Sequence, residues 1–463
     1  MNLVFFGCGG VGSALLEMIF LPYFRRKINI RSVLVIDPRD LSTEPIITEL
    51  TKSGILSHVQ VEITKKNLFS ILKKYVGKNA IIVDVSYNVY FLPVVKWCLD
   101  NNIRYVNTSM ERWPVENEEI LGNIYSRTLY RLHRRYEKLK GLHNPTIVVE
   151  HGMNPGLITH FTKQALINVA KQKLKEKPFP RLKRACKRQD FATIAYLLNL
   201  RAVHCSEKDT QISLVSRQPT EFVNTWGAYS FYGEGVDPVQ LGYGTHENKI
   251  DLAISPPSRL EQNQIFLPIR GIDLKLESFV PFSGKITGMC VPHGENDTIS
   301  RMLTLYRRGK PVYRPSNYYV YSPCQEAWKS LDAVRENNYV MLEKQHPLRG
   351  WEISTGYDAV GALLIFENNN KITSYWAGTV LSIEQTRKYG LKYAGPTVAQ
   401  VAISLVNVLI WMEKHPHLGL CYPEDLPYQD ILKFSKKWLG NVFMNWVPYE
   451  PSGTKLSDFA THQ

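Results

Sequence analysis

The first twelve residues constrain the fold of this chain more than any other stretch. Residues 3–6 form an apolar run typical of a buried strand, and glycines then follow at G-x-G-x-x-G spacing before a helix-compatible segment, residues 11–20. A strand, a tight turn and a helix N-terminus in this order suit a dinucleotide pyrophosphate, because backbone N–H groups at a helix start attract anions. The turn residues that we expect to bind such a cofactor are Gly7, Gly9, Gly10, Val11 and Gly12.

A second apolar run supports the same interpretation. Residues 33–36 are followed by Asp37, which lies 25 residues beyond Gly12. A carboxylate at the end of this strand is placed to accept hydrogen bonds from an adenosine ribose. Because strand, turn, helix, second strand and acid all agree, we predict a dinucleotide site here rather than a Gly-rich structural turn.

Apolar runs continue to alternate with helical periodicity up to about residue 150, which is the pattern of β-α-β units and a parallel sheet. We therefore predict a complete, Rossmann-type doubly wound sheet of six strands in a domain of residues 1–152. The expected strands are residues 3–6, 33–36, 59–63, 80–85, 104–107 and 146–149, and the expected helices are residues 11–20, 68–76, 93–100 and 116–140.

Polar residues follow three of these strands. Ligands of open α/β sheets bind beyond the carboxyl ends of the strands. We therefore expect the cofactor to be faced by Asp84, Ser86, Asn88 and Thr108, although Asn88 also suits an Asx-type turn. The sixth strand leads into a Glu-His-Gly-Met-Asn-Pro-Gly turn, and we expect its Asn154 to contact cofactor or substrate.

The second half of the chain has a different character. From residue 199 onward, short strands and turns rich in Gly, Pro, Tyr and Trp predict an α+β domain over residues 153–393. Residues 394–440 should form helices that pack back on the cofactor domain, and residues 441–463 a loose tail. Each of the candidate site residues in this half also has a structural explanation when taken singly: Glu207, Trp226, Glu234, His293 and Asp358.

The formal net charge of +14 raises the question of a nucleic-acid partner. Nine basic side chains against one Glu fall within residues 171–188, where two prolines prevent one continuous helix. No recognisable nucleic-acid module surrounds this stretch. We therefore interpret it as a solvated connection or helix face, and binding to RNA or an anionic surface remains the alternative.

Cysteine usage and hydropathy bear on the compartment. The seven cysteines include no C-x-x-C pair and no zinc spacing, so we predict no metal site, and the chain starts with a predicted strand in place of a signal peptide. These features favour the cytoplasm. The most apolar stretch, residues 398–412, is shorter than the roughly 20 residues of a spanning helix, and we predict no membrane segment.

Four segments together resemble the bacterial homospermidine synthases, within the saccharopine dehydrogenase-like superfamily. They are Gly-Cys-Gly-Gly-Val-Gly, Glu-His-Gly-Met-Asn-Pro-Gly, Asn-Thr-Trp-Gly and Pro-His-Gly-Glu, and the resemblance covers nearly the whole chain. It implies NAD held as a prosthetic group in a homodimer. The implied reaction joins two putrescines, or putrescine and spermidine, into homospermidine through imine intermediates, with loss of ammonia or 1,3-diaminopropane.

The resemblance also implies roles for the candidate residues. Trp226 would hold an ammonium or iminium group over its indole face, where a desolvated cation–π contact contributes about 2 kcal/mol. Glu207 and Glu234 would anchor the amine ends, with Asp358 as a further anchor. His293 would carry a proton or orient a group near the reacting carbon.

Two other functions remain open. A saccharopine-type NAD(P)-dependent reductase would join an amine to an oxo acid, but its carboxylate substrate calls for Arg or Lys forks. The segments that carry the resemblance present Glu, Asp and Trp instead, which favours a diamine. A basic NAD-binding scaffold for RNA or another anionic partner is the alternative from a different class.

Overall fold

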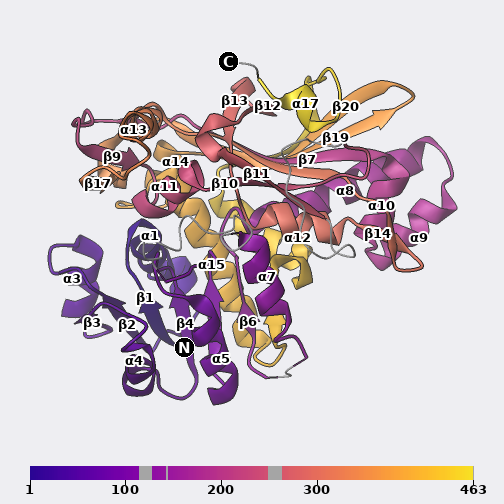
Figure 1. The fold of residues 1–463 in the computed structure, drawn as a ribbon. Coiled ribbons are helices and arrows are strands. Elements are labelled where there is room, and N and C mark those ends of the chain that lie inside the picture. The colour runs from indigo at the N-terminus through magenta and orange to yellow at the C-terminus, as the bar shows by residue number, and fades with distance from the viewer. Residues whose placement is uncertain (114–127, 142–143, 249–262, 462–463) are drawn as a thin grey trace.

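A parallel sheet and a larger mixed sheet, joined by long helices, organise the protein (Figure 1). The computed structural model describes residues 1–113, 128–141, 144–248 and 263–461. The first part of the helix expected over residues 116–140 lies outside the described residues. Its remainder forms α7 (Leu129–Glu137).

The N-terminal sheet confirms the predicted Rossmann-type fold. In the described residues its order is β3-β2-β1-β4-β5-β6-β21, and every neighbouring pair is parallel. The strand order reverses between β1 and β4, which is where doubly wound sheets bind ligands. The strands are β1 (Asn2–Phe6), β2 (Ser32–Asp37), β3 (Leu56–Gln60), β4 (Ala80–Asp84), β5 (Arg104–Asn107), β6 (Ile147–Val148) and β21 (Leu420–Cys421).

Two details of this sheet differ from the prediction. The third strand begins at Leu56, three residues before the expected start at residue 59, because its pairing with β2 opens at Val33 opposite Leu56. The edge beyond β6 carries a seventh strand, β21, which comes from the C-terminal part of the chain. A two-residue edge strand has too little periodicity for detection from sequence.

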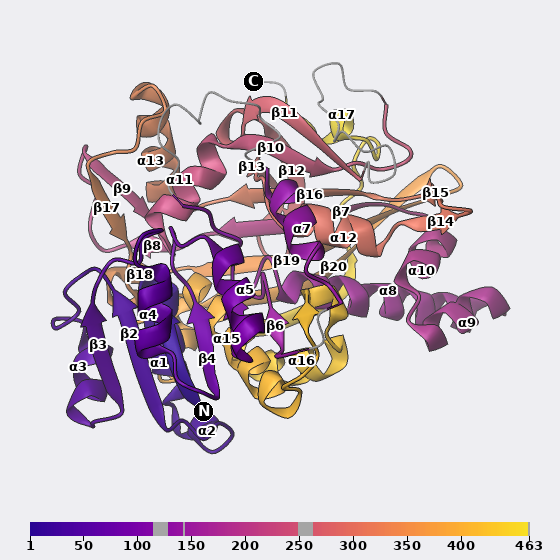
Figure 2. The ribbon, with the colours of Figure 1, turned by 60° about the horizontal axis from the view of Figure 1, so that its bottom comes forward.

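Helices cover both faces of the parallel sheet (Figure 2). The core on one face contains residues of α1, α3 and α15, and the core on the other contains residues of α4, α5 and α7. This is why the strands read as continuous apolar runs. The further helices of this half are α1 (Gly10–Ile19), α2 (Pro22–Arg25), α3 (Pro45–Lys52), α4 (Leu68–Tyr75) and α5 (Phe91–Asn101).

The second sheet confirms the predicted α+β domain. Its main path in the described residues is β11-β10-β16-β7-β19-β20-β22, with β13 joined to β16 and β12 to β13. Among the pairs that the described part of the chain forms in this sheet, only β7–β16 is parallel. The strands are β7 (Leu200–Asp209), β10 (Pro238–Gly242), β11 (Gln264–Arg270), β12 (Lys275–Val280), β13 (Gly284–Cys290), β16 (Ser316–Ser322), β19 (Tyr357–Asn368), β20 (Lys371–Ser382) and β22 (Asn441–Val447).

Smaller elements surround this sheet. The short strands, which form three two-stranded pairs, are β8 (Ile212–Ser213) with β18 (Ile353–Thr355), β9 (Glu221–Asn224) with β17 (Lys344–Pro347), and β14 (Leu305–Arg307) with β15 (Lys310–Tyr313). The helices are α8 (Leu157–Glu176), α9 (Pro180–Arg188), α10 (Phe191–Leu198), α11 (Ala228–Val236), α12 (Glu295–Met302), α13 (Gln325–Glu336), α14 (Ile383–Lys388), α15 (Pro396–Lys414), α16 (Tyr428–Ser435) and α17 (Leu456–Phe459). The basic stretch is divided between α8 and α9, as its prolines predict.

Helix α15 packs against α1 and also contacts β19 and β20, so it connects the two sheets. Its length and hydropathy match those of a membrane span, but the protein itself covers 89% of its most apolar window. A core helix of a globular fold has these properties. The helices expected within residues 394–440 are α15 and α16, and a short 3-10 turn at Lys436–Trp438 follows α16.

The prediction of a loose tail over residues 441–463 is wrong. Strand β22 pairs along seven residues with β20, and α17 buries Leu456 and Phe459 against the core of the mixed sheet. The polar composition from Ser452 onward suggested a tail, whereas β22 is an edge strand that keeps much of its surface in solvent.

Candidate active site

The glycine turn between β1 and α1 leaves space for a ligand. A Cβ atom built on Gly9 would have no heavy atom within 4 Å. The first N–H groups of a helix have no intrahelical partner and point out of its N-terminus. Ser86, which follows β4, lies beside this turn, since its Cα is 3.0 Å from the position of a Cβ on Gly7. The predicted residues of the turn therefore surround an open backbone cradle that suits a pyrophosphate.

The turn also contacts the second half of the chain. A Cβ atom built on Gly10 would lie 2.9 Å from the backbone oxygen of Trp226 and 3.3 Å from a methyl group of Val398. Any side chain at Gly10 would push these segments apart. The close approach brings the Trp226 segment next to the place where the cofactor cradle begins.

Asp37 is buried at the end of β2 and is held by a neighbouring arginine. Its Oδ2 accepts a hydrogen bond of 2.8 Å from the Cys8 backbone N–H, and both carboxylate oxygens accept hydrogen bonds of 2.9 Å from the Arg39 guanidinium. Burial opposes the charge, but the Arg39 contacts outweigh it and lower the pKa of Asp37. The carboxylate therefore stays ionised beside the glycine turn.

The other predicted cofactor residues have different surroundings. Asp84 accepts hydrogen bonds from the Ser86 hydroxyl at 2.6 Å and the Tyr105 hydroxyl at 2.8 Å, and burial raises its pKa to about 6. Asn88 is partly exposed beyond β4, and Thr108 lies beside Gly152 after β5. The carboxylate oxygens of Asp84 thus already accept hydrogen bonds from protein groups. Ser86 lies beside the glycine turn.

A cluster of five carboxyl groups lies in the mixed-sheet half. Glu207 and Asp209 lie on the same face of β7, because side chains two residues apart in a strand point the same way. Asp358 on β19 pairs in register with Asp209, while Glu234 comes from α11 and Glu295 from the first turn of α12. Four of the five are buried, and the side chain of Glu234 is 11% exposed.

Glu207 connects the cluster to the Asn-Pro-Gly turn. Its Oε2 accepts hydrogen bonds of 2.9 Å from the Asn154 amide and 2.6 Å from the Tyr319 hydroxyl. Burial raises the pKa of Glu207 to about 8, and the neighbouring charges of Glu234 and Asp209 act in the same direction. The carboxyl group is consequently protonated at neutral pH unless a cation arrives.

His293 lies between two members of the cluster. Its Nδ1 contacts Glu295, its Nε2 lies 3.5 Å from Oε1 of Glu234, and its ring centroid is 5.0 Å from that of Tyr319. Burial opposes a charge on the imidazole. The carboxylates of Glu295 and Glu234 outweigh this effect and hold the pKa of His293 well above its ordinary value. Among the described residues, the ion pairs of the five carboxyl groups all involve His293.

Asp209 and Asp358 connect the cluster to the Trp226 segment. Oδ2 of Asp209 accepts a hydrogen bond of 2.7 Å from the hydroxyl of Thr225, the residue before Trp226. Burial raises the pKa of Asp209 and, together with the charges of Glu207 and Asp209, that of Asp358. The Trp226 ring is partly buried and packs edge-on to Phe231 at 6.3 Å between centroids.

The structure thus brings Asn154, Glu207, Glu234 and His293 into one contact network, with Asp358 beside it. The sequence analysis missed Asp209, Glu295 and Tyr319. Alternation along β7 could have added Asp209 to Glu207, and Glu295 stands two residues after His293. Tyr319 lacks a local signal, because only the parallel pairing of β16 with β7 places it here.

Fold and site together define a two-domain enzyme of the dehydrogenase type, with a dinucleotide cradle next to an acidic second domain. Comparison with protein-family models agrees with this class. Residues 3–146 match the saccharopine dehydrogenase NADP binding domain, and residues 152–441 match the saccharopine dehydrogenase C-terminal domain. The chain belongs to the saccharopine dehydrogenase family.

Among curated relatives and solved structures, this chain is similar to homospermidine synthases. Homospermidine synthases from Mesorhizobium japonicum and Blastochloris viridis are each 28% identical in sequence to this chain. Each alignment covers 96% of this chain, and they cover 91% and 92% of the two relatives, respectively. A Legionella pneumophila homospermidine synthase solved in complex with NAD has a TM-score of 0.86 and 28% identity, with coverage of 100% of this chain and 98% of that chain. Saccharopine dehydrogenase from Saccharomyces cerevisiae shares the fold, at a TM-score of 0.54 and 10% identity, with coverage of 96% and 99%.

Proposed function

We propose that this protein is an NAD-dependent homospermidine synthase. It converts two putrescines, or putrescine and spermidine, to homospermidine and releases ammonia or 1,3-diaminopropane. The observation that carries the proposal is the cluster of five carboxyl groups whose ion pairs, in the described residues, involve a single imidazole. Such a cluster holds one imidazolium against five carboxyl groups, and a diamine supplies further positive charge. The relatives named homospermidine synthase support the same activity.

The residues of the glycine turn fit a dinucleotide. The open space at Gly9 accommodates the pyrophosphate, and Gly7, Gly10, Val11 and Gly12 supply the backbone around it. The buried, ionised Asp37 at the end of β2 suits a ribose 2′-hydroxyl, as NAD presents. The NAD complex of the Legionella pneumophila relative supports this choice.

The acidic cluster fits the substrate amines. Glu207 and Glu234 anchor ammonium groups through charge-assisted hydrogen bonds, with Asp358 as a further anchor. Asn154 keeps one oxygen of Glu207 oriented by its 2.9 Å hydrogen bond. Trp226, whose backbone adjoins the glycine turn, offers its π-face to a cationic carbon–nitrogen group near the cofactor.

Proton transfer is the second task of the cluster. An amine must lose a proton before its lone pair can assist hydride loss from the adjacent carbon, and NAD supplies the hydride acceptor and donor when bound. The amine pKa is about 10.4, so transfer to a carboxylate with a pKa of about 8 is less unfavourable than transfer to an ordinary glutamate. We assign this base role to Glu207. His293, held as an imidazolium, acts as an acid toward the leaving amine.

The main alternative is a saccharopine-type reductase with an oxo-acid substrate. A substrate carboxylate requires an Arg or Lys fork, but in the described residues the cation that contacts Glu234 and Glu295 is the His293 imidazolium. The observed surroundings therefore support the diamine. The scaffold alternative rests on the basic stretch at the end of α8 and in α9, and Figure 2 shows the α9 ribbon at the edge of the molecule, away from the parallel sheet.

We also propose a homodimer in the cytoplasm, without a nucleic-acid or membrane partner. The seven cysteines are free thiols, and six of them are buried, which suits a reducing compartment. Light scattering of the purified protein at several concentrations measures the assembly. A monomer at every concentration would contradict the dimer.

Product analysis tests the proposed activity. Purified protein is incubated with putrescine and a catalytic amount of NAD, and ammonia, homospermidine and absorbance at 340 nm are followed together. We expect stoichiometric ammonia and homospermidine without lasting accumulation of NADH. A requirement for an oxo acid with steady NADH consumption would establish the reductase instead.

A further inference from the structure

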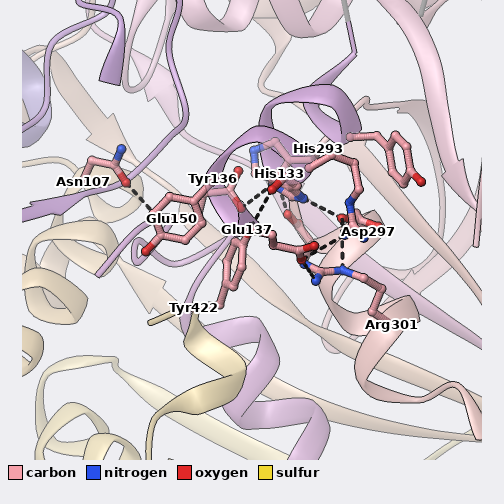
Figure 3. A network of polar contacts seen from close by, with 12 residues as sticks. Asn107, His133, Tyr136, Glu137, Glu150, His293, Asp297, Arg301 and Tyr422 are labelled. Carbon is pink, nitrogen blue, oxygen red and sulfur yellow. Dashed lines mark hydrogen bonds and ion pairs between the residues drawn. The ribbon is translucent and has the colours of Figure 1, made fainter. Parts of the chain in front are cut away.

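A histidine outside the cluster of five carboxyl groups connects the two halves of the protein (Figure 3). His133 on α7 has no exposed surface. Its Nδ1 lies 2.7 Å from Oδ2 of Asp297 on α12, and its Nε2 lies 2.9 Å from Oε2 of Glu150 after β6. The first contact has hydrogen-bond alignment, whereas the second is an ion pair at an unfavourable angle. One imidazole thus contacts a carboxylate of the cofactor domain, Glu150, and a carboxylate of the α+β domain, Asp297.

Further charges complete the network. Arg301 on α12 contacts Asp297 at 3.2 Å through Nε and also contacts Glu137. Arg134 lies 3.4 Å from Asp297 and 3.0 Å from Glu137. Asn263 donates a hydrogen bond of 2.6 Å to the other oxygen of Asp297.

Two groups at the β21 end of the cofactor sheet also face the network. Tyr422 presents its ring to His133 at 5.6 Å and to the Arg301 guanidinium at 5.1 Å. The buried carboxyl group of Glu424 is also close to Arg301, although burial raises its pKa. When the imidazole is protonated, the network holds equal numbers of positive and negative groups. The positive groups are His133, Arg134 and Arg301, and the negative groups are Glu137, Glu150 and Asp297.

Both carboxylates bound by His133 are close in the chain to site residues. Glu150 precedes Asn154 by four residues in the turn, and Asp297 follows His293 by four residues. The Glu150 carboxylate also lies against Gly294, the residue after His293, because a Cβ atom built on Gly294 would be 2.3 Å from its Oε1. The backbone next to His293 therefore rests on the Glu150 side chain.

The network continues to the cofactor side. The backbone N–H of Glu150 donates a hydrogen bond of 2.8 Å to Asn107 at the end of β5, and Asn107 donates one of 3.1 Å to Tyr105, which binds Asp84. The position of Glu150 is consequently set from the sheet on one side and by His133 on the other.

From these contacts we propose that His133 is a positioning residue for catalysis, which holds the Glu150 carboxylate under Gly294 and so places His293 against Glu234 and Glu295. The role rests on the proposed function. Burial opposes the charge on His133, but Glu150 and Asp297 outweigh it and raise its pKa to about 9. The imidazolium is present at neutral pH and is lost as the pH rises through about 9.

The experiment compares four variants of the full chain. His133→Gln removes the charge, and Gly294→Ala keeps every polar group but displaces the Glu150 carboxylate. His204→Gln is the control for loss of a buried histidine, since His204 is fully buried on the opposite face of β7 from Glu207. Gly77→Ala is the control for the glycine change, since a Cβ there meets no atom within 4 Å.

We expect His133→Gln and Gly294→Ala to lower kcat about 100-fold, because misplacement of about 1 Å has this effect, with NAD affinity unchanged. The fall of kcat above pH 9 that depends on His133 should disappear in His133→Gln. The two controls should keep kcat. Folded His133→Gln protein with wild-type kcat and pH profile, or an equal loss of kcat in His204→Gln, would overturn the proposal.

Amide hydrogen exchange separates this proposal from the assigned activity. Segment 291–297, which contains His293 and Gly294, should exchange faster in His133→Gln than in the wild type and remain unchanged in His204→Gln. A wild type without homospermidine formation but with this exchange pattern would refute the function alone. Unchanged exchange in an active enzyme whose His133→Gln variant keeps kcat would refute the positioning role alone.

Discussion

The glycine turn and the carboxylate cluster are built in opposite ways. The turn uses consecutive residues between β1 and α1, whereas the cluster gathers Glu207, Asp209, Glu234, Glu295 and Asp358 from four elements. A cofactor cradle made of local backbone carries its own sequence signature. A cluster assembled by strand register, such as the proposed substrate site, carries no such signature, so its members become visible as a set only in the fold.

The electrostatics of the two regions differ in the same direction. Asp37 beside the turn is neutralised by Arg39, which lowers its pKa, whereas burial without such a partner raises the pKa of Glu207 to about 8. The cofactor site is therefore electrostatically complete in the protein. On the proposed function, the cluster gains its missing positive charge only when a cationic substrate binds, and the predictions below test this difference.

The largest effect is expected from Glu207→Gln. Loss of one partner of a buried charge pair costs about 3 kcal/mol, or more than about 100-fold in kcat/KM for putrescine. The binding of NAD should not change. Steady-state kinetics and cofactor titration measure both quantities. Glu367→Gln is the matched control, because Glu367 is a partly exposed partner of Arg201 at the far end of β19. Equal kinetics of Glu207→Gln and this control would refute the substrate role.

Trp226→Ala should have the next largest effect. Loss of a desolvated cation–π contact of about 2 kcal/mol predicts a fall of about 30-fold in kcat/KM. Trp226→Phe should retain most of the activity because it keeps a π-face. Trp446→Ala removes a tryptophan that is 44% exposed on β22 and should be neutral. If Trp226→Phe were as impaired as Trp226→Ala, indole packing would explain the loss better than a cation–π contact.

Asp37→Ala should affect the other region. Loss of a charged hydrogen-bond acceptor predicts a rise of about 10-fold in the dissociation constant of NAD, with kcat near the wild-type value once NAD is saturating. Calorimetric titration of protein freed of cofactor measures the constant. Asp40→Ala, in the same loop but fully exposed, is the control. A large loss of kcat at saturating NAD would break the separation between the two regions.

The smallest effect is a proton release. Glu207 is protonated below its pKa of about 8, and a bound dication favours the carboxylate, so binding of a diamine at pH 7 should release about one proton. The release should fade, and the affinity should level off, as the pH rises above about 8. Calorimetry in buffers of different ionisation enthalpy measures the release. An undiminished release in Glu207→Gln would assign the proton to another group.

The sequence predicted the cofactor half of the fold well, because buried parallel strands are apolar runs and crossover helices have a clear period. Its failures lie at edges. Strand β21 has too few residues for a detectable pattern, and the apolar residues of β22 do not alternate with polar ones, since three of them are consecutive at residues 442–444. Their places are determined by pairing with strands far away in the chain, namely β6 and β20.

For the site, single residues were predicted but their relations were not. Glu207 and His293 were candidates without a defined partner, and the structure supplies Asn154, Tyr319 and Glu295. Chain distance explains the gap, since Tyr319 lies 112 residues from Glu207. His133 gave no signal at all, because a single His in a charged helix is indistinguishable from a solvated one until its burial is known.

The central claim is that a hydride is borrowed from a diamine and returned within the same site. It is tested most directly with putrescine deuterated at both carbons next to nitrogen, in the presence of catalytic unlabelled NAD and a pool of unlabelled NADH. Mass spectrometry of the homospermidine should show that all carbon-bound deuterium is retained, with ammonia formed in equal amount. Product that has exchanged deuterium for hydrogen from the NADH pool, or no product without an oxo acid, would contradict the account.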